Sequence, residues 1–340
     1  MAKTRMAIVG LGMASTPHAQ SLKDLADRVE VAAAFSPSEE RRRAFGQKYD
    51  FPIADGIDAI FSDASIDAVM LLTPPSTHLD LVRRAAAAGK HVLLEKPLEI
   101  SLERSNALVE AAEKAGIRLG IVLQHRFRPV STKLAEIVQS GRLGEIVGAS
   151  ARLANWRPQS YYDQPGRGTK ARDGGGVLLT QGIHTLDLLI SLAGLPSEVV
   201  AFATTTPVHR METEDMAAAA LRFANGALGT VNATTCAYPG FADSIELIGT
   251  AGTARIEDTT LDVRFHDASE YRHDDGALGG GAGADPMAFS HEHHRAVLSD
   301  FLNALETGGE PKVSGREALK VHRLIEALLR SAETGGCEKV

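Results

Sequence analysis

Short apolar segments alternate with amphipathic segments over the first third of the chain. The apolar segments are nearly continuous in hydrophobicity, as strands are when a sheet buries both of their faces. Helical spacing fills the intervals, for example over residues 77–90 and 101–116, where Ser101 is a favourable N-cap and Gly116 a favourable end. This alternation predicts a doubly wound parallel sheet. The predicted strands are Met6–Gly10, Val29–Phe35, Ala68–Pro74, His91–Glu95 and Leu119–Gln124.

The hydrophobic pattern changes near Gln124. A helix is predicted over residues 128–141, because Pro129 suits its first turn and Gly141 its end. The following segments alternate polar and apolar residues with a period of two, which predicts an antiparallel or mixed sheet. These segments are residues 146–156, 198–206, 215–235, 244–257 and 261–266.

The second half also contains predicted helices and one glycine-rich loop. We expect a single helix over Gly174–Ala193, a flexible loop over Gly276–Asp285, and closing helices near Ser290–Thr307 and Gly315–Glu333. A chain of 340 residues is too long for one ordinary core. The length and the change of pattern together predict two domains, residues 1–123 and residues 124–340.

Composition and charge narrow the class of protein. Hydrophobic residues make up 44% and charged residues 23%, and the formal net charge of -7 argues against a nucleic-acid-binding surface. Cys236 and Cys337 have no metal-ligand spacing and offer no disulfide framework, which fits a reducing compartment. No stretch approaches the roughly 18–20 apolar residues of a membrane span, and the first apolar run is too short for a signal peptide. We therefore expect a cytoplasmic protein without a nucleic-acid or membrane partner.

A glycine-rich turn follows the first predicted strand. In Gly10-x-Gly12-x-x-Ser15, the first glycine allows a tight turn, the second lets the backbone approach a pyrophosphate, and a small third residue fits where helix meets strand. Backbone N–H groups at the helix start, in a turn that includes Met13, would receive the anion. We predict that this turn binds a dinucleotide; the alternative is a strand–helix turn without a ligand.

The end of the second predicted strand bears on the choice of nucleotide. Ser36 stands where an acidic residue would grip the ribose 2′-hydroxyl of NAD, and Arg41, Arg42 and Arg43 follow. Without the carboxylate, a 2′-phosphate meets no repulsion, and Arg41 can pair with it. This favours NADP over NAD. The alternative is that the arginines form a solvated helix face.

Two further turns follow predicted strands at the same edge of the sheet, where ligands bind in such folds. Thr73 and Pro74 lie in one turn with His78 just after them, and Glu95 and Lys96 lie in the other. We assign all five residues to cofactor binding. The alternative for the Glu-Lys pair is an ordinary strand exit with a surface lysine.

The segment "GGGVLLTQGIHTLDLL" (Gly174–Leu189) places one histidine in an apolar helix. Thr180, His184 and Asp187 share one face of the predicted helix, and the glycines before them leave backbone N–H groups free. Asp187 either orients the imidazole of His184 or caps the helix. A lone histidine on an apolar helix is more often a core residue than a catalytic base, so this segment alone decides nothing.

Several motifs in one order resemble the Gfo/Idh/MocA family, which includes glucose–fructose oxidoreductase and inositol dehydrogenase. The motifs are "GLGMAS", "TPPSTH", "AGKHVLLEKP", "QHRFRP", "GRLGEI", "DGGGVLLTQGIHTLDLL" and "ED…LRFANGALG". The resemblance spans nearly the whole chain. It implies a Rossmann domain joined to an α+β domain with an open, largely antiparallel sheet, an NAD(P)-dependent enzyme acting on sugars or cyclitols, and a homodimer or homotetramer formed across that sheet.

The resemblance also assigns roles to single residues. Lys96 of "EKP" corresponds to the family's active-site lysine, and His184 to its catalytic histidine. Histidine titrates near neutral pH and can take the proton of a hydroxyl whose carbon loses hydride, while the lysine would stabilise the developing charge. Thr180 stands where many members carry aspartate, which puts a direct transfer of their sugar specificity in doubt.

Substrate contacts are expected from the segments around these two residues. Residues 157–176 resemble those of members that act on a nucleotide-linked N-acetylglucosaminuronic acid. The alternative is that these residues form a solvated loop without a role in substrate binding. The predicted substrate residues are Arg126, Tyr162, Arg167, Thr180 and His184. "HEHH" (His291–His294) lacks metal-ligand spacing on a helix, so we predict a capped, solvated helix start and no metal site.

The sequence therefore predicts an NAD(P)-dependent oxidoreductase acting on a secondary hydroxyl of a sugar, cyclitol or sugar derivative. Lys96 and His184 are predicted to handle the proton of one alcohol. Two alternatives stay open: a glycosidase that uses the cofactor only for transient hydride transfer, and a non-catalytic regulator that senses the cofactor.

Overall fold

The computed structural model describes residues 3–276, 283 and 290–340, and most of the predicted loop Gly276–Asp285 lies outside them. The chain divides into two compact units, Met1–Gln124 with Ser290–Leu319, and His125–Phe289 with Lys320–Val340. The prediction of one domain over residues 124–340 differs from this division. The reason is that the helix after Ser290 packs on the first unit, where the N–H of Ile121 also donates to the carbonyl of Val313 at 2.9 Å.

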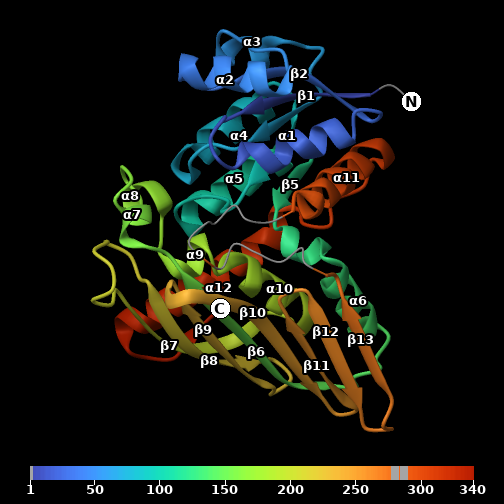
Figure 1. Ribbon diagram of the computed structural model, residues 1–340, viewed down its shortest axis with the longest axis vertical. Helices are drawn as coiled ribbons and strands as arrows, with labels where there is room; N and C mark the ends of the chain where they lie inside the picture. The colour runs from blue at the N-terminus through green and yellow to red at the C-terminus, as the bar shows by residue number, and fades with distance from the viewer. Residues whose placement is uncertain (1–2, 277–282, 284–289) are drawn as a thin grey trace. The chain divides into compact units, whose positions relative to one another are not determined.

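The first unit contains a five-stranded parallel sheet in the order β2-β1-β3-β4-β5 (Figure 1). β2 lies on one side of β1, and the chain then crosses over to place β3 on its other side. The strand order therefore reverses at β1, and such sheets bind ligands at the carboxyl end of the strands at this point. The strands are β1 (Thr4–Val9), β2 (Val29–Phe35), β3 (Ala68–Leu71), β4 (His91–Glu95) and β5 (Leu119–Val122).

Helices connect these strands and cover the sheet. Two of them begin with serine caps: Ser101, as predicted, accepts the N–H of Arg104, and Ser38 accepts the N–H of Arg41. The helices of this unit are α1 (Ser15–Asp24), α2 (Glu39–Tyr49), α3 (Ile57–Ser62), η1 (Pro75–Thr77), α4 (His78–Ala87), α5 (Leu102–Lys114) and α11 (Glu292–Thr307).

The second unit is built on a nine-stranded sheet in the order β13-β12-β11-β10-β6-β9-β8-β7-β14. Among the described strands of this sheet only β6 and β9 pair in parallel, so the sheet is largely antiparallel, as predicted. The strands are β6 (Ile146–Trp156), β7 (Pro196–Thr204), β8 (Met216–Phe223), β9 (Leu228–Thr234), β10 (Cys236–Gly249), β11 (Gly252–Glu257), β12 (Thr260–Phe265), β13 (Glu270–Asp274) and β14 (Glu338–Lys339).

One face of this sheet is covered by α10, which packs on β6 and β10 (Figure 1). The helices of this unit are η2 (Gln124–Phe127), α6 (Pro129–Gln139), α7 (Gln159–Tyr162), α8 (Lys170–Asp173), α9 (Val177–Thr180), α10 (Ile183–Ala193) and most of α12 (Gly315–Thr334). In the described residues no single helix is long and apolar enough to cross a membrane; Lys170–Thr180 and Ile183–Ala193 meet that test only as a pair bent by 50°.

The prediction of one helix over Gly174–Ala193 is wrong. Helix α9 ends at Thr180, and α10 begins only at Ile183. The N–H of Gly182 turns back to the carbonyl of Val177 at 2.7 Å, five residues earlier, which closes α9 before α10 starts. Thr180 and His184 therefore belong to different helices and do not share a helix face.

Candidate functional site

The glycine-rich turn between β1 and α1 has the features that a dinucleotide requires. Gly10 has φ +104°, and a Cβ there would lie 2.6 Å from the backbone of Leu72, so the fold itself demands glycine. A Cβ at Gly12 would meet nothing within 4 Å. Packing does not explain this second glycine, whereas a pyrophosphate lying against the turn would. Met13, predicted to contact the cofactor, is 51% exposed in the same turn.

The turn after β2 separates the three arginines. Ser36 is buried, and its carbonyl accepts the guanidinium of Arg42 at 2.6 Å. Arg42 is thus bound to the turn, whereas Arg41 is exposed in the first turn of α2. Arg43 is exposed too, but it lies one residue beyond Arg42, so Arg41 is the exposed arginine nearer the turn, where a 2′-phosphate could approach.

His78 joins the turns after β3 and β4. His78 Nε2 lies 2.9 Å from the carbonyl of Thr73, and Nδ1 lies 3.0 and 3.1 Å from the carbonyls of Pro97 and Leu98. The side chain is completely buried, and this burial lowers its pKa. His78 therefore lies beneath the two turns and fixes them to each other, a role that the motif "TPPSTH" did not reveal.

Lys96 follows β4 directly and is half-buried. The carboxylate of Glu95 accepts the backbone N–H of Lys96 at 3.1 Å and contacts His18 Nε2 at 2.7 Å. Both carboxylate oxygens of Glu95 are thus bonded to protein groups. Its position is that of a support for the turn.

In the second unit, a buried carboxylate caps α9. Glu214 accepts the N–H groups of Gly176 and Leu178 at 3.0 and 3.1 Å, and its carbonyl accepts the N–H of Val177 at 2.8 Å. Burial raises the pKa of Glu214 although these bonds oppose the rise. The expectation that the glycines leave free N–H groups is therefore wrong at Gly176. A Cβ on this glycine would lie 1.8 Å from the Glu214 carbonyl oxygen, so the contact requires glycine.

His184 lies in the first turn of α10 and is 9% exposed. Its ring stacks on that of His125 with 4.9 Å between centroids and 30° between planes. Arg128 donates to His125 Nε2 at 2.6 Å, so this nitrogen accepts and a neutral His125 ring carries its proton on Nδ1. The site thus contains a second imidazole. It belongs to the motif "QHRFRP", but the sequence did not indicate that it stacks on His184.

Asp187, one turn after His184, is bonded to Arg126. The guanidinium donates to both carboxylate oxygens, at 2.7 Å from Nε and 2.6 Å from Nη2, and the two side chains are 8% and 0% exposed. Both alternatives for Asp187, orienting the imidazole or capping the helix, omitted this ion pair. The bidentate geometry gives Arg126 a structural role besides the predicted contact with substrate.

The other predicted substrate residues also have protein partners. The hydroxyl of Thr180 donates to the carbonyl of Gly176 at 2.6 Å, within α9. Tyr162 is buried, its hydroxyl donates to Thr235 Oγ1 at 2.9 Å, and burial raises its pKa. Arg167 lies over the ring of Tyr161 at 4.6 Å and donates to that hydroxyl. Arg167 keeps donors for an anion, whereas Tyr162 has the surroundings of a core residue.

Two comparisons with known proteins bear on this geometry. The model of an oxidoreductase family with an NAD-binding Rossmann fold matches residues 4–122, and that of a GFO/IDH/MocA C-terminal domain matches residues 131–255. D-xylose 1-dehydrogenase (NADP(+)) 2 of Haloferax volcanii is 29% identical over 90% of each chain, and D-apiose dehydrogenase of Paraburkholderia graminis is 28% identical over 97% of this chain and 88% of that one.

Solved structures extend the likeness to the complete fold. The WlbA dehydrogenase from Bordetella pertussis, in complex with NADH and UDP-GlcNAcA, is 29% identical, with a TM-score of 0.85 over 100% of this chain and 99% of that one.

Proposed function

This chain belongs to the Gfo/Idh/MocA family of oxidoreductases, and we propose that it transfers hydride between the nicotinamide of NAD(P) and a secondary hydroxyl of a sugar, a cyclitol or a sugar derivative. The observation that carries the proposal is the turn after β1. Its first glycine is required by the fold, while its second has open space above it, at the point where the strand order of the sheet reverses.

The residues around that turn fit a dinucleotide. N–H groups at the start of α1 would receive the pyrophosphate, and Gly12 would let it approach the backbone. Bound NAD(P) would supply the hydride acceptor. Ser36 and Arg41 favour NADP, because no acidic side chain stands at the end of β2 and Arg41 is exposed beside it. NAD remains the alternative, and the WlbA complex contains NADH.

Oxidation of an alcohol needs a group that removes the hydroxyl proton. We assign this to His184, whose imidazole can accept a proton near neutral pH. Lys96 would donate a hydrogen bond to the oxygen of a substrate hydroxyl and stabilise the negative charge that develops on it. A positioned general base contributes typically about 10²–10⁴-fold to the rate.

The proposed substrate class is sugar-like, with a nucleotide-linked uronic acid as a specific candidate. Its support is the likeness to a WlbA dehydrogenase structure that holds UDP-GlcNAcA. Arg167, stacked on Tyr161 with donors to spare, is the side chain we assign to a carboxylate or phosphate of such a ligand.

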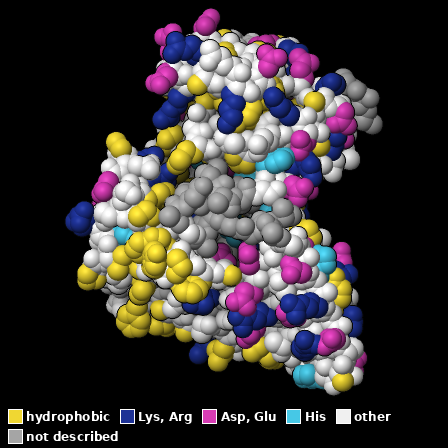
Figure 2. Space-filling model, in the orientation of Figure 1, with side chains coloured by type: hydrophobic (Ala, Val, Ile, Leu, Met, Phe, Trp, Pro, Cys, Tyr) yellow, Lys and Arg dark blue, Asp and Glu magenta, His cyan; other side chains and the backbone are white. Residues whose placement is uncertain are grey.

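We also propose a homodimer or homotetramer. The face of the nine-stranded sheet opposite α10 exposes large apolar side chains, and Figure 2 shows apolar residues gathered over β7–β9. Within β7–β9 the most exposed are Phe202 at 77% and Leu228 at 61%. Apolar patches of this kind mark interaction sites, because a monomer gains nothing from leaving them in water. A cytoplasmic location stays a prediction.

The experiment that tests the function is a substrate panel with NAD and NADP in parallel. It contains D-xylose, myo-inositol and UDP-GlcNAcA, and each reaction is followed by the absorbance of reduced nicotinamide and by chromatography of the products. We expect net reduction of the cofactor with at least one of them. Product release without net reduction would support transient hydride transfer in a glycosidase instead.

Residue roles are tested on the substrate so identified. We expect Lys96→Ala and His184→Ala each to abolish turnover while NAD(P)H still binds, as measured by its fluorescence on titration. Wild-type turnover in either variant would contradict the role given to that residue.

A further inference from the structure

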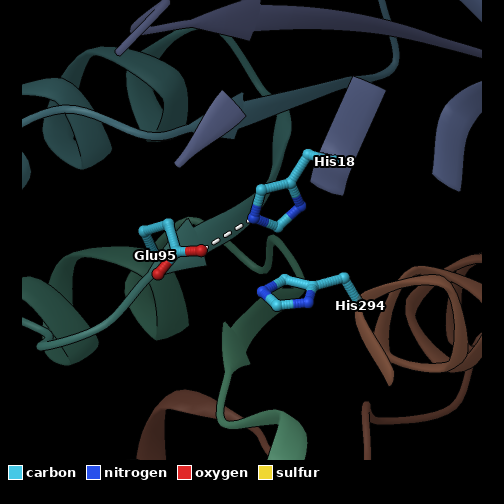
Figure 3. A group of neighbouring side chains, drawn as sticks. All are labelled: His18, Glu95 and His294. Carbon is cyan, nitrogen blue, oxygen red and sulfur yellow. Dashed lines mark hydrogen bonds and ion pairs between the residues drawn. The ribbon is translucent and has the colours of Figure 1, made fainter. Parts of the chain in front are cut away.

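A buried cluster of two histidines and a glutamate lies in the first unit, beside Lys96. His18 comes from α1, Glu95 from the end of β4 and His294 from α11, and the three side chains point toward one another (Figure 3). His18 and His294 are 1% and 4% exposed, and the Glu95 side chain is 12% exposed. The prediction of a solvated helix start over "HEHH" is therefore wrong for His294.

The carboxylate of Glu95 connects α1 to the peptide of Lys96. Oε1 lies 2.7 Å from His18 Nε2, and Oε2 accepts the backbone N–H of Lys96 at 3.1 Å. Burial by itself raises the pKa of Glu95, but the hydrogen bond from His18 and the positive charge of Lys96 lower it overall. The carboxylate is thus ionised and can only accept, so His18 Nε2 carries the proton and donates it.

His294 closes the cluster as a neutral ring. Its ring meets that of His18 edge-on, with 5.0 Å between centroids and 90° between planes. Burial lowers the pKa of His294 to about 3, so this imidazole is uncharged at neutral pH. An uncharged ring that keeps water away strengthens the bond between His18 and the carboxylate, because the local dielectric constant is low.

The peptide groups on the other side of Lys96 are fixed as well. His78, from α4, contacts the carbonyls of Pro97 and Leu98 at 3.0 and 3.1 Å. The backbone that carries Lys96 is thus held by Glu95 from one side and by His78 from the other. A side chain that acts at one atom of a substrate needs such a fixed base, since a displacement of about 1 Å can cost on the order of 100-fold in rate.

We propose that His18 and Glu95 are positioning residues for Lys96: the carboxylate, oriented by His18, sets the lysine peptide and so the direction in which the ammonium group extends. The catalytic importance of Lys96 rests on the proposed function. The placement of its side chain by His18 and Glu95 does not. It also connects α1, the helix whose start would bind the pyrophosphate, with the lysine through two successive hydrogen bonds.

A metal ion is the alternative occupant of the cluster. Two imidazoles and a carboxylate with ligand atoms within 4.8 Å of one another are a common ligand set for zinc. The hydrogen bonds favour positioning, because both oxygens of Glu95 already accept N–H protons. Metal analysis of the purified protein separates the two: one tightly bound metal ion per chain, retained in wild type and lost in His18→Leu, would overturn the proposal.

The main test observes the Lys96 side chain without any substrate. Lysines are methylated with isotopically labelled formaldehyde, and Lys96→Arg identifies the Lys96 signal in proton–carbon correlation spectra. We expect this signal to shift or broaden in His18→Leu and Glu95→Gln. In His18→Gln, whose amide retains an N–H donor, we expect it to stay as in wild type.

His91→Leu is the matched control. His91 begins β4, and its Nδ1 accepts the N–H of Arg118 at 2.9 Å, so the variant removes a similar hydrogen bond at the opposite end of the same strand. It should leave the Lys96 signal in place even where it lowers stability. An unchanged Lys96 signal in both His18→Leu and Glu95→Gln would overturn the proposal.

Kinetics on the substrate found by the panel add a second measurement. We expect His18→Leu to lower kcat by about 10- to 100-fold, with KM for the cofactor within about threefold of wild type. If Lys96→Ala turns over like wild type, the proposed function fails, while the lysine signal still decides whether His18 and Glu95 place this side chain.

Discussion

Replacing Arg126 by methionine tests whether this side chain holds α10 in place or binds substrate. Its guanidinium makes two hydrogen bonds to the carboxylate of Asp187, at 2.7 and 2.6 Å, and both side chains are buried. Methionine keeps an unbranched apolar stem but removes the charge and the donors. The carboxylate of Asp187 then remains in the interior without the cation that compensates it.

The expected loss of stability follows from that geometry. Removing one partner of a buried ion pair costs about 3–5 kcal/mol, because the remaining charge stays desolvated. With a urea m-value of about 2 kcal/mol/M, the unfolding midpoint should fall by about 1.5–2.5 M. Arg126→Met combined with Asp187→Leu should regain most of this loss, since apolar residues of similar size replace a buried ion pair at little cost.

A single tryptophan makes the measurement specific to the second unit. Trp156 is the only tryptophan in the chain and lies in β6, so its fluorescence during a urea titration follows the unfolding of that unit. Arg152→Met removes an exposed arginine from the same strand and serves as the control, with an expected change within about 0.5 kcal/mol. An unchanged midpoint in Arg126→Met together with a raised substrate KM would refute the ion-pair argument and make Arg126 a substrate ligand.

Four further outcomes are expected. Gly12→Ala should keep the wild-type melting temperature but weaken NAD(P)H binding by about tenfold or more in a fluorescence titration, whereas Gly10→Ala should lower the melting temperature, because its Cβ would overlap the Leu72 backbone. Burial raises the pKa of Asp243 to about 6, above its ordinary 3.8, so the folded state binds this proton more tightly and stability falls as pH rises through this range. Between pH 4 and 7 the free energy of unfolding of the wild type should therefore fall by about 2–3 kcal/mol more than that of Asp243→Asn, as measured by urea titration. Arg41→Ala should weaken NADPH binding several-fold, by about 1 kcal/mol, and leave NADH binding unchanged in parallel titrations. Phe202→Glu should reduce the oligomer to monomers in light scattering, since it places a charge in the exposed apolar face.

The sequence predicted best the strands whose own side chains show a continuous or alternating apolar pattern. β2, β4 and β6 begin and end at the predicted residues, because continuous or alternating apolar side chains record burial directly. β13 and β14 were not predicted. The segment "EYRHD" (Glu270–Asp274) has no apolar alternation, and it is a strand only because β12 pairs with it.

Long-range contacts decided what the sequence could not predict. The start of α9 at Val177, three residues after the predicted helix start, depends on Glu214, which lies 38 residues from Gly176 and caps α9. The local sequence from Gly174 to Ala193 favours one continuous helix. No residue near Gly176 in the sequence indicates that a distant carboxylate caps α9. In the same way, Arg126 and Asp187 are 61 residues apart, and each looked like a free functional group before the fold brought them together.

The two consecutive residues His125 and Arg126 explain how His184 is held. His125 stacks on His184, and Arg126 bonds to Asp187 three residues farther along α10. Residues three apart lie on nearly the same face of a helix, so these two contacts fix the rotation of α10 about its axis as well as its distance from η2. A helix fixed in rotation holds the imidazole of His184 in one orientation, as the proposed general base requires. The ion pair and the stacked ring thus serve one purpose, and disrupting the ion pair should lower kcat even at urea concentrations where the second unit is still fully folded.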